Sequence, residues 1–237
     1  MIEDPVTGIW SYTGGQELDR QLYRYEVTVY HPKATGIQVL DVTDPYSVSL
    51  STNSRFSQFV NLADEDLKPE GWDTHDIPTI ANFEDAVIYE GHIRDFSVLD
   101  ESTSATNRGK YMAFTEDGSL PVEHLRKLAE KGVTHFHMLP ANDIASIEED
   151  TNNSVDLNST FGDLCNLNRR ADICQDASIS DDMLLIDLYQ SFGVGEGLRA
   201  QELTEALRGY DQFNWGYDPY HFNVPEGSYA SDAEGVA

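Results

Sequence analysis

Basic residues are scarce in this chain of 237 residues, because 15 Lys and Arg stand against 42 Asp and Glu and leave a formal net charge of -27. So much negative charge repels phosphate backbones and anionic lipid surfaces, so we expect neither nucleic acid nor membrane-surface partners. Long apolar runs are also missing: no stretch approaches the roughly 18 apolar residues that cross a bilayer, and no membrane insertion is expected. Neutral ligands remain compatible with this charge, which otherwise indicates a solvated acidic surface.

A recognisable export signal is missing too. Residues 1–4, Met-Ile-Glu-Asp, have neither the basic start nor the apolar stretch of a signal peptide. We therefore expect either a cytosolic protein or one whose export signal lies outside this sequence. Cysteine is rare, with only Cys165 and Cys174. They could close a small disulfide loop in an exported protein or remain free thiols in a cytosolic one, and the residues themselves leave both readings open.

The signature motifs of several enzyme classes are absent. The sequence contains no phosphate-binding P-loop, no Gly-rich dinucleotide fingerprint and no Gly-x-Ser-x-Gly motif. Asp218, His221 and Glu226 lie close together in the sequence, but their spacing matches no zinc or EF-hand pattern. We therefore predict no metal site and no cofactor within this chain.

Residues 1–65 have the pattern of strands and turns. Over 22–30, apolar and polar residues alternate with the period of two that is typical of a half-buried strand. A turn at 31–36 leads into a second strand over 37–42. Because so few strands bury too little apolar area to be stable alone, we expect this region to be part of a β-sandwich, followed by a linker at 66–85.

Residues 86–237 have the pattern of an α/β domain. A mostly apolar strand over 86–89 comes first and is typical of a strand buried on both faces of a parallel sheet. A helix over 119–132 follows, with Ser119 as a candidate cap, and then a strand over 133–139. A strand, a helix and a strand in this order predict a βαβ unit.

Residues 141–210 interrupt this pattern. They contain both cysteines and two expected helices, over 181–192 and 198–207. Connections between neighbouring elements usually have about 2 to 6 residues, so this segment is an insertion that decorates the domain. Insertions at the carboxyl ends of strands are where α/β barrels place functional residues.

Aromatic residues are concentrated near the end of the sequence, with six of them among the 17 residues 213–229. Interspersed Gly and Pro exclude a regular helix and favour a structured loop. Aromatic faces stack on the C–H faces of sugar rings, while neighbouring Asn, Asp and His side chains hydrogen-bond hydroxyl groups. Composition alone nevertheless favours the alternative, a loop whose rings pack against its own domain.

Several collinear motifs resemble those of pullulanase-type starch-debranching enzymes, a family of the alpha-amylase superfamily (glycoside hydrolase family 13). Asn-Trp-Gly-Tyr-Asp-Pro at 214–219 and Val-Pro-Glu-Gly-Ser-Tyr at 224–229 are similar to a signature of that family. The other motifs agree in order and spacing. Residues 23–27 and 42–47 resemble parts of a family 48 carbohydrate-binding module. Residues 89–97 and 132–140 resemble the first two barrel strands, and residues 108–111 resemble the loop after the first of them. The resemblance spans nearly the whole chain.

The resemblance implies a fold and a site. We expect an α/β fold with an all-β N-terminal part: a partial β-sandwich followed by the first two βα units of a TIM-type (β/α)8 barrel, with the long insertion after the second strand. Tyr217 would stack on the glucose at the cleavage subsite, and Trp215 and Asp218 would shape the same pocket. Cys165 and Cys174 would form a disulfide, because similar exported pullulanases carry a cysteine pair in this insertion.

Three further polar residues are better explained as structural. His92, on an expected strand, fits a hydrogen-bonded core histidine better than a ligand. Arg94 and Asp95 would pair near the rim of the barrel and support its shape.

The resemblance also implies an activity for the complete protein. It would be an extracellular or cell-surface, monomeric hydrolase that cleaves α-1,6-glucosidic bonds in pullulan, amylopectin and limit dextrins. Such enzymes use a retaining mechanism with two carboxylates about 5 to 5.5 Å apart. No Asp or Glu here stands in a matching motif, so we expect no catalytic residue in this chain and no activity from the chain alone. Calcium is a candidate ligand of the complete protein.

Two alternatives remain. One is an isoamylase or a glycogen-debranching enzyme of the same superfamily, although residues 214–219 and the insertion favour the pullulanase type. The other is a non-catalytic glucan-binding protein that ends where this sequence ends.

Overall fold

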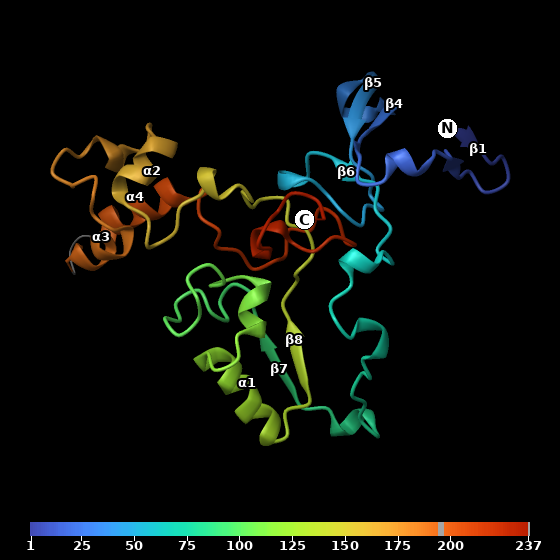
Figure 1. Cartoon of the computed structure of the whole chain (residues 1–237). Helices are drawn as coiled ribbons and strands as arrows, with labels where there is room; N and C mark the ends of the chain where they lie inside the picture. The colour runs from blue at the N-terminus through green and yellow to red at the C-terminus, as the bar shows by residue number, and fades with distance from the viewer. Residues whose placement is uncertain (194–196, 237) are drawn as a thin grey trace. The chain divides into compact units, whose positions relative to one another are not determined.

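The computed structural model describes residues 1–193 and 197–236 and contains two compact units (Figure 1). The first comprises Met1–Asp76 with the residues from Glu234 onward, and the second comprises Ile77–Ala233. The second unit differs from the expected domain 86–237 at its end, because the Gly235 N–H donates to the Leu50 carbonyl of the first unit at 2.9 Å. No helix among the described residues is long and apolar enough to span a membrane.

The regular elements are short. The strands are β1 (Ile2–Glu3), β2 (Trp10–Ser11), β3 (Leu22–Tyr23), β4 (Tyr25–His31), β5 (Gly36–Val42), β6 (Ser57–Gln58), β7 (Ile88–Gly91) and β8 (His135–Met138). The α-helices are α1 (Leu120–Glu130), α2 (Phe161–Leu167), α3 (Leu185–Ser191) and α4 (Gly197–Leu207). In the described part of the chain the strands pair in twos, with β1–β2, β3–β6 and β4–β5 antiparallel and β7–β8 parallel.

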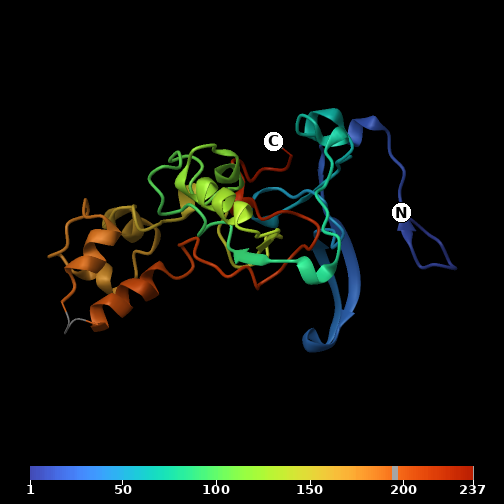
Figure 2. The ribbon, with the colours of Figure 1, turned by 90° about the horizontal axis from the view of Figure 1, so that it is seen from below.

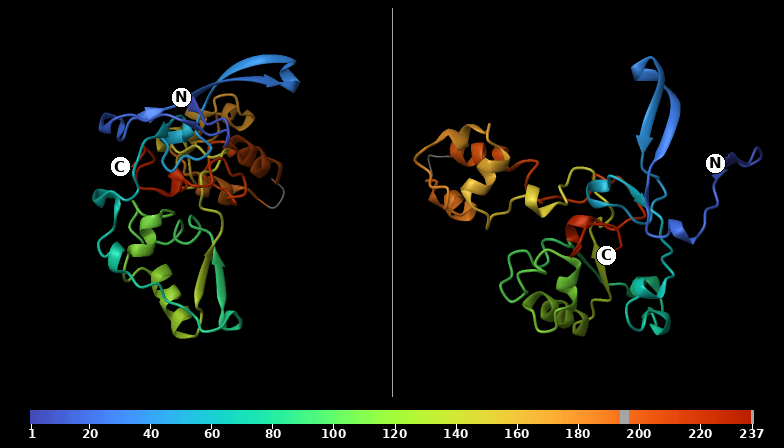
Figure 3. Two further views of the ribbon diagram at one scale, coloured as in Figure 1. Left: turned by 90° about the vertical axis from the view of Figure 1, so that its right-hand side faces the viewer. Right: turned by 45° about the horizontal axis from the view of Figure 1, so that its top comes forward.

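The longest strands form an antiparallel hairpin of β4 and β5 in the first unit (Figure 3). Its register pairs Tyr25 with Val42 at one end and His31 with Gly36 at the other, and residues 32–34 make the turn. The predicted turn and second strand are therefore confirmed.

The single strand predicted over 22–30 is wrong in one respect. The structure divides it at Arg24, because residues 22–23 pair with β6 while the residues from Tyr25 onward pair with β5. The ends of this strand are thus set by the strands with which it pairs, β6 and β5, and not by the local alternation of apolar and polar residues. A β-sandwich built on these strands stays a prediction.

The expected βαβ arrangement is confirmed in the second unit. β7 and β8 are parallel neighbours with Ile88 opposite His135, and α1 connects them (Figure 1). Pro121 lies in the first turn of α1, where its missing N–H costs nothing, and Gly132, with φ of +103°, follows the helix. Ser119 stands at the N-cap position, but its side chain makes no capping hydrogen bond, so the predicted cap is wrong.

The prediction that the first of these strands is buried on both faces is also wrong. Val87 is 50% exposed and Ile88 is 61% exposed. α1 packs on one face, where the rings of Tyr89 and His124 meet edge to face at 5.9 Å between centroids. Among the described residues the sheet consists of β7 and β8 alone, so its edges and much of its apolar surface face solvent.

The insertion folds around a core of its own (Figure 2). The Val155 N–H donates to the Tyr210 carbonyl at 2.8 Å, so the two ends of the inserted segment meet. The helices expected over 181–192 and 198–207 correspond to α3 and α4, although α3 is shorter than predicted. The buried residues of this core are Val155, Phe161, Leu164, Ile173, Leu185, Leu188, Leu203, Ala206 and Leu207.

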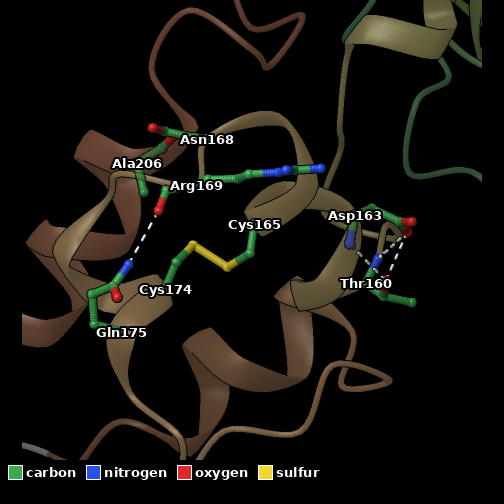
Figure 4. The surroundings of a disulfide bond; sticks show 8 residues. All are labelled: Thr160, Asp163, Cys165, Asn168, Arg169, Cys174, Gln175 and Ala206. Atoms are coloured by element: carbon green, nitrogen blue, oxygen red, sulfur yellow. Dashed lines mark hydrogen bonds between the residues drawn. A yellow bond between two sulfur atoms is a disulfide. The ribbon is translucent and has the colours of Figure 1, made fainter.

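The expected disulfide between Cys165 and Cys174 is present and joins α2 to the 3-10 turn that follows it (Figure 4). α2 itself was not predicted. It begins with a capping box, in which the Thr160 side chain accepts from the Asp163 N–H and the Asp163 carboxylate accepts from the Thr160 N–H. The Thr-x-x-Asp spacing was therefore a sequence signal that could have revealed this helix.

Candidate functional site

The aromatic loop, residues 213–222, runs beside the segment that follows β8. The Tyr220 N–H donates to the Asp143 carbonyl at 2.9 Å, and the Asp143 N–H donates to the Val224 carbonyl at 2.9 Å. Because β8 ends at Met138, this pairing holds the loop near the carboxyl ends of the two parallel strands. Open α/β sheets and α/β barrels bind their ligands at that end.

The large rings of the aromatic loop face solvent. Trp215 is 65% exposed and Tyr217 is 69% exposed, and Phe213, Tyr220 and Phe222 are exposed as well. Asp218 is also exposed, while its backbone carbonyl accepts from the Ala145 N–H at 2.9 Å. The alternative in which these rings pack into their own domain does not describe this loop. An exposed group of apolar rings of this kind marks a surface that contacts a ligand or another molecule.

Asn214 connects the aromatic loop to the interior of the second unit. Its Oδ1 accepts a hydrogen bond from the Tyr229 hydroxyl at 2.7 Å and lies 3.1 Å from His92 Nε2. Its Nδ2 donates to the Gln212 carbonyl at 3.0 Å. His92 and Tyr229 are both buried, so the interpretation of His92 as a hydrogen-bonded core histidine is confirmed.

Arg94 and Asp95 form the predicted ion pair, with 3.1 Å between Arg94 Nη1 and Asp95 Oδ1. Asp95 also lines a cavity of about 410 Å³ between β7, β8, α1 and the segment after β7. No residue of the aromatic loop lines this cavity. Trp215 and Tyr217 therefore belong to an open surface and not to the wall of that cavity.

Three buried carboxylates meet beside the aromatic loop. Asp143, Glu149 and Glu226 each offer an oxygen within 4.8 Å of the others. His221 lies against this acidic cluster, with its Nδ1 2.7 Å from Asp143 Oδ2. Carboxylate oxygens are the ligands that Ca²⁺ prefers in proteins. The acidic cluster could therefore hold a hard divalent cation, or it could share protons between its members.

Burial shapes the electrostatics of this cluster. Burial raises the pKa of the Glu226 carboxyl, and the nearby charge of Asp143 adds to the rise. The Lys110 ammonium donates to the Ser228 carbonyl at 2.6 Å, and burial lowers the pKa of Lys110 while Glu226 partly restores it. Lys110 is thus a positive charge that interacts with the Glu226 carboxylate.

The acidic cluster is not the group of residues that lie close together in the sequence, which is Asp218, His221 and Glu226. Asp218 is exposed in the aromatic loop, whereas Glu226 meets Asp143 and Glu149 instead. The absence of a metal site stays a prediction, and the acidic cluster is the place to test it. No spacing rule could have found these residues, because Asp143 and Glu226 stand on opposite sides of the insertion in the sequence.

Known proteins match the whole chain. Residues 144–213 match the family model described as Pullulanase Ins domain. The chain is 42% identical over 247 residues to the pullulanase of Klebsiella aerogenes, an alignment that covers 100% of this chain and 22% of that protein. It is 36% identical over 237 residues to Pullulanase 1, chloroplastic, of Arabidopsis thaliana, which covers 97% of this chain and 21% of that protein.

Solved structures of pullulanases also match the whole chain. PulA from Klebsiella oxytoca superposes with a TM-score of 0.92 at 40% identity, over 100% of this chain and 23% of that one. Klebsiella pneumoniae pullulanase complexed with maltotriose gives a TM-score of 0.91 at 39% identity, again over 100% of this chain and 23% of that one. The chain thus spans about a fifth of the length of its curated relatives.

Proposed function

We propose that this chain, which is a pullulanase segment by homology along its whole length, supplies part of the substrate site of a glycoside hydrolase. That enzyme would cleave α-1,6-glucosidic bonds in pullulan, amylopectin and limit dextrins. The observation that carries the proposal is the exposure of Trp215 and Tyr217 in the aromatic loop. A structural relative has been solved with maltotriose, which supports an α-glucan as the ligand class.

Each predicted site residue has a role that fits its chemistry. The exposed ring of Tyr217 offers a flat apolar face on which a glucose ring can stack. Trp215 offers a second such face, and the exposed carboxylate of Asp218 can accept hydrogen bonds from sugar hydroxyl groups. Together they orient the glucan and do not break the bond.

The bond-breaking groups would come from the rest of the enzyme. In a retaining hydrolase one carboxylate attacks the anomeric carbon and a carboxylic acid protonates the leaving oxygen. We assign neither role to an Asp or Glu of this chain, and we expect the chain alone to be inactive. In the complete enzyme, β7 and β8 would be the first two strands of a (β/α)8 barrel, and the first unit would complete a β-sandwich module.

We also propose a location for the complete protein and no metal ion within this chain, with Ca²⁺ a candidate ligand of the complete protein outside this segment. The buried carboxylates are instead held by their own hydrogen bonds, since Glu226 accepts from the Ile144 and Ser228 N–H groups and Glu149 accepts from the Gly227 N–H. The disulfide between Cys165 and Cys174 supports an extracellular or cell-surface location, because such bonds persist in oxidising compartments. We expect the complete protein to be monomeric.

Glucan binding by Tyr217 is the step to test first. Tyr217→Ala in the complete protein should migrate faster than the wild type in amylopectin affinity gels, because the stacking face is lost. Leu198→Ala is the control, since Leu198 is likewise 69% exposed but lies on α4 of the insertion, outside the proposed carbohydrate-binding module. Unchanged migration of Tyr217→Ala would remove the main site assignment.

Product analysis separates the alternatives. A pullulanase should release maltotriose from pullulan, whereas an isoamylase or a glycogen-debranching enzyme should leave pullulan largely intact and debranch amylopectin or glycogen. A protein that binds amylopectin but releases no sugar from any of these glucans would be the non-catalytic binding protein.

A further inference from the structure

We propose that Tyr229 and His92 position the rings of Trp215 and Tyr217 for glucan binding, acting through Asn214. The inference deepens the proposed function and rests on it. None of these three residues would touch the glucan; they would be positioning residues whose hydrogen bonds hold the ring-bearing loop in one arrangement.

The hydrogen-bond pattern fixes the orientation of the Asn214 side chain. The Arg94 N–H donates to His92 Nδ1 at 3.2 Å, so the proton of a neutral His92 ring sits on Nε2. That N–H then faces Asn214 Oδ1 at 3.1 Å and the Tyr229 hydroxyl oxygen at 3.2 Å. The Tyr229 hydroxyl donates to Asn214 Oδ1 at 2.7 Å. Asn214 Oδ1 therefore receives two donors, which leaves Nδ2 to face the carbonyl that it binds.

Burial makes this arrangement stiff. Tyr229 is 1% exposed and His92 is 6% exposed, whereas Trp215, the residue after Asn214, is 65% exposed. Loss of Asn214 Oδ1 would leave the buried Tyr229 hydroxyl without the acceptor of its proton, which costs more than the bond itself contributes. Asn214, which is hydrogen-bonded to these buried residues, is thus followed directly by the exposed ring of Trp215.

A second anchor lies on the other side of Trp215. Gly216 is buried with φ of +76°, and a Cβ placed on it would lie 2.5 Å from the Pro140 carbonyl oxygen. Asn214 is tied to His92, which follows β7, and Gly216 sits against Pro140, which follows β8. Trp215 is therefore held between two fixed points at the carboxyl ends of the parallel strands.

Two-point anchoring matters for affinity. A loop that is already ordered loses less conformational freedom when the glucan binds, so more of the stacking energy appears as affinity. Loss of the Asn214 anchor would free Trp215 and the nearby Tyr217 to sample other positions. We expect glucan binding to weaken about tenfold when the hydrogen bonds to Asn214 are removed.

The test uses the complete protein with three variants. Tyr229→Phe removes one donor and keeps the buried ring, and Asn214→Leu removes both acceptor contacts. Asn214→Asp keeps the acceptor oxygens but loses the Nδ2 donor to the Gln212 carbonyl. Tyr111→Phe is the matched control, because the Tyr111 hydroxyl also donates to a carbonyl, that of Ala141 at 2.9 Å, without touching Asn214.

Two readouts are needed. Amylopectin affinity measures binding, and fluorine NMR of 5-fluorotryptophan reports on the Trp215 ring, whose resonance is assigned by its absence in Trp215→Phe. We expect Tyr229→Phe and Asn214→Leu to shift or broaden this resonance and to weaken binding. Asn214→Asp should fall between Asn214→Leu and the wild type in both readouts, and Tyr111→Phe should change neither.

The outcomes distinguish the two proposals. If the Trp215 resonance and the affinity of Tyr229→Phe both match the wild type, Tyr229 does not position the loop and the inference is wrong. If the resonance responds but Tyr217→Ala binds glucan as the wild type does, the positioning of the ring stands and the proposed glucan site is wrong.

Discussion

The buried carboxylate of Glu226 accepts a hydrogen bond from the Ile144 N–H at 2.7 Å, and this contact joins the segment after the aromatic loop to the segment after β8. The other carboxylate oxygen accepts from the Ser228 N–H at 2.9 Å. Burial raises the pKa of the Glu226 carboxyl above its ordinary value, although these bonds favour the charged form. The contact is therefore sensitive to pH.

Glu226→Gln should flatten the pH dependence of stability. The folded-state pKa of Glu226 is raised, so the folded protein holds this proton more tightly than the unfolded chain does. The free energy of unfolding that this adds is fully present below about pH 4.5 and is lost as the pH rises through the folded-state pKa. The wild type in the presence of a chelator should therefore lose more stability than Glu226→Gln between mildly acidic and neutral pH. Calorimetric melting of both proteins across that range checks this. Parallel curves would show that Glu226 does not carry the effect.

The acidic cluster tests the prediction that this chain holds no metal. A cation that binds only the folded state adds about 2.7 kcal/mol at a hundredfold excess over its Kd. If the chain holds no metal, the melting temperature should be the same with added CaCl₂ and with chelator. An upward shift with CaCl₂ that Asp143→Asn with Glu149→Gln abolishes would instead place a cation at the acidic cluster.

Gly216→Ala should destabilise the protein by about 2 kcal/mol or more, because an L-residue at this φ is strained and its Cβ would meet the Pro140 carbonyl. Gly118→Ala is the control: Gly118 has φ of +90° but no atom within 4 Å of the added Cβ, so it should lose only about 1 kcal/mol. Equal melting temperatures for the two variants would mean that the close approach at Gly216 has no cost.

Replacement of both cysteines by serine should destabilise the insertion. The bond between Cys165 and Cys174 closes a loop with a sequence separation of 9, for which chain entropy predicts about 2.5 kcal/mol. Hydrogen exchange should show faster opening of α2, while peptides from β4 and β5 in the first unit should exchange as before. The reduced wild type should match the double variant, and a difference between them would point to an effect of serine itself.

The 237-residue chain expressed alone should associate or aggregate. Val87 and Ile88 expose apolar surface beside the unpaired edges of β7 and β8, and such edges pair with other chains. Size-exclusion chromatography with light scattering measures this. A monomer that melts cooperatively would contradict the expectation.

Local patterns predicted the elements whose residues interact with near neighbours in the sequence. The alternation over β4 predicted a strand, and the periodicity of α1 with its flanking Pro121 and Gly132 predicted a helix. The disulfide followed from the resemblance to pullulanases, because the two cysteines alone left their pairing open. The break of the first predicted strand at Arg24 was not predicted, because it depends on pairing with β6. α2 is different, because its capping box of Thr160 and Asp163 is a local signal that its sequence does carry.

The sequence by itself determined the βαβ order, a long insertion that carries both cysteines, and an aromatic-rich loop near its end. The disulfide and the sugar-binding role of that loop followed only from the resemblance to pullulanases. Only the tertiary structure decided that Trp215 and Tyr217 face solvent and that Asn214 is held by His92 and Tyr229. It alone brought Asp143 beside Glu226. The physical reason is that periodicity and turn chemistry act between neighbouring residues, whereas burial and carboxylate proximity arise only when distant segments of the chain pack together.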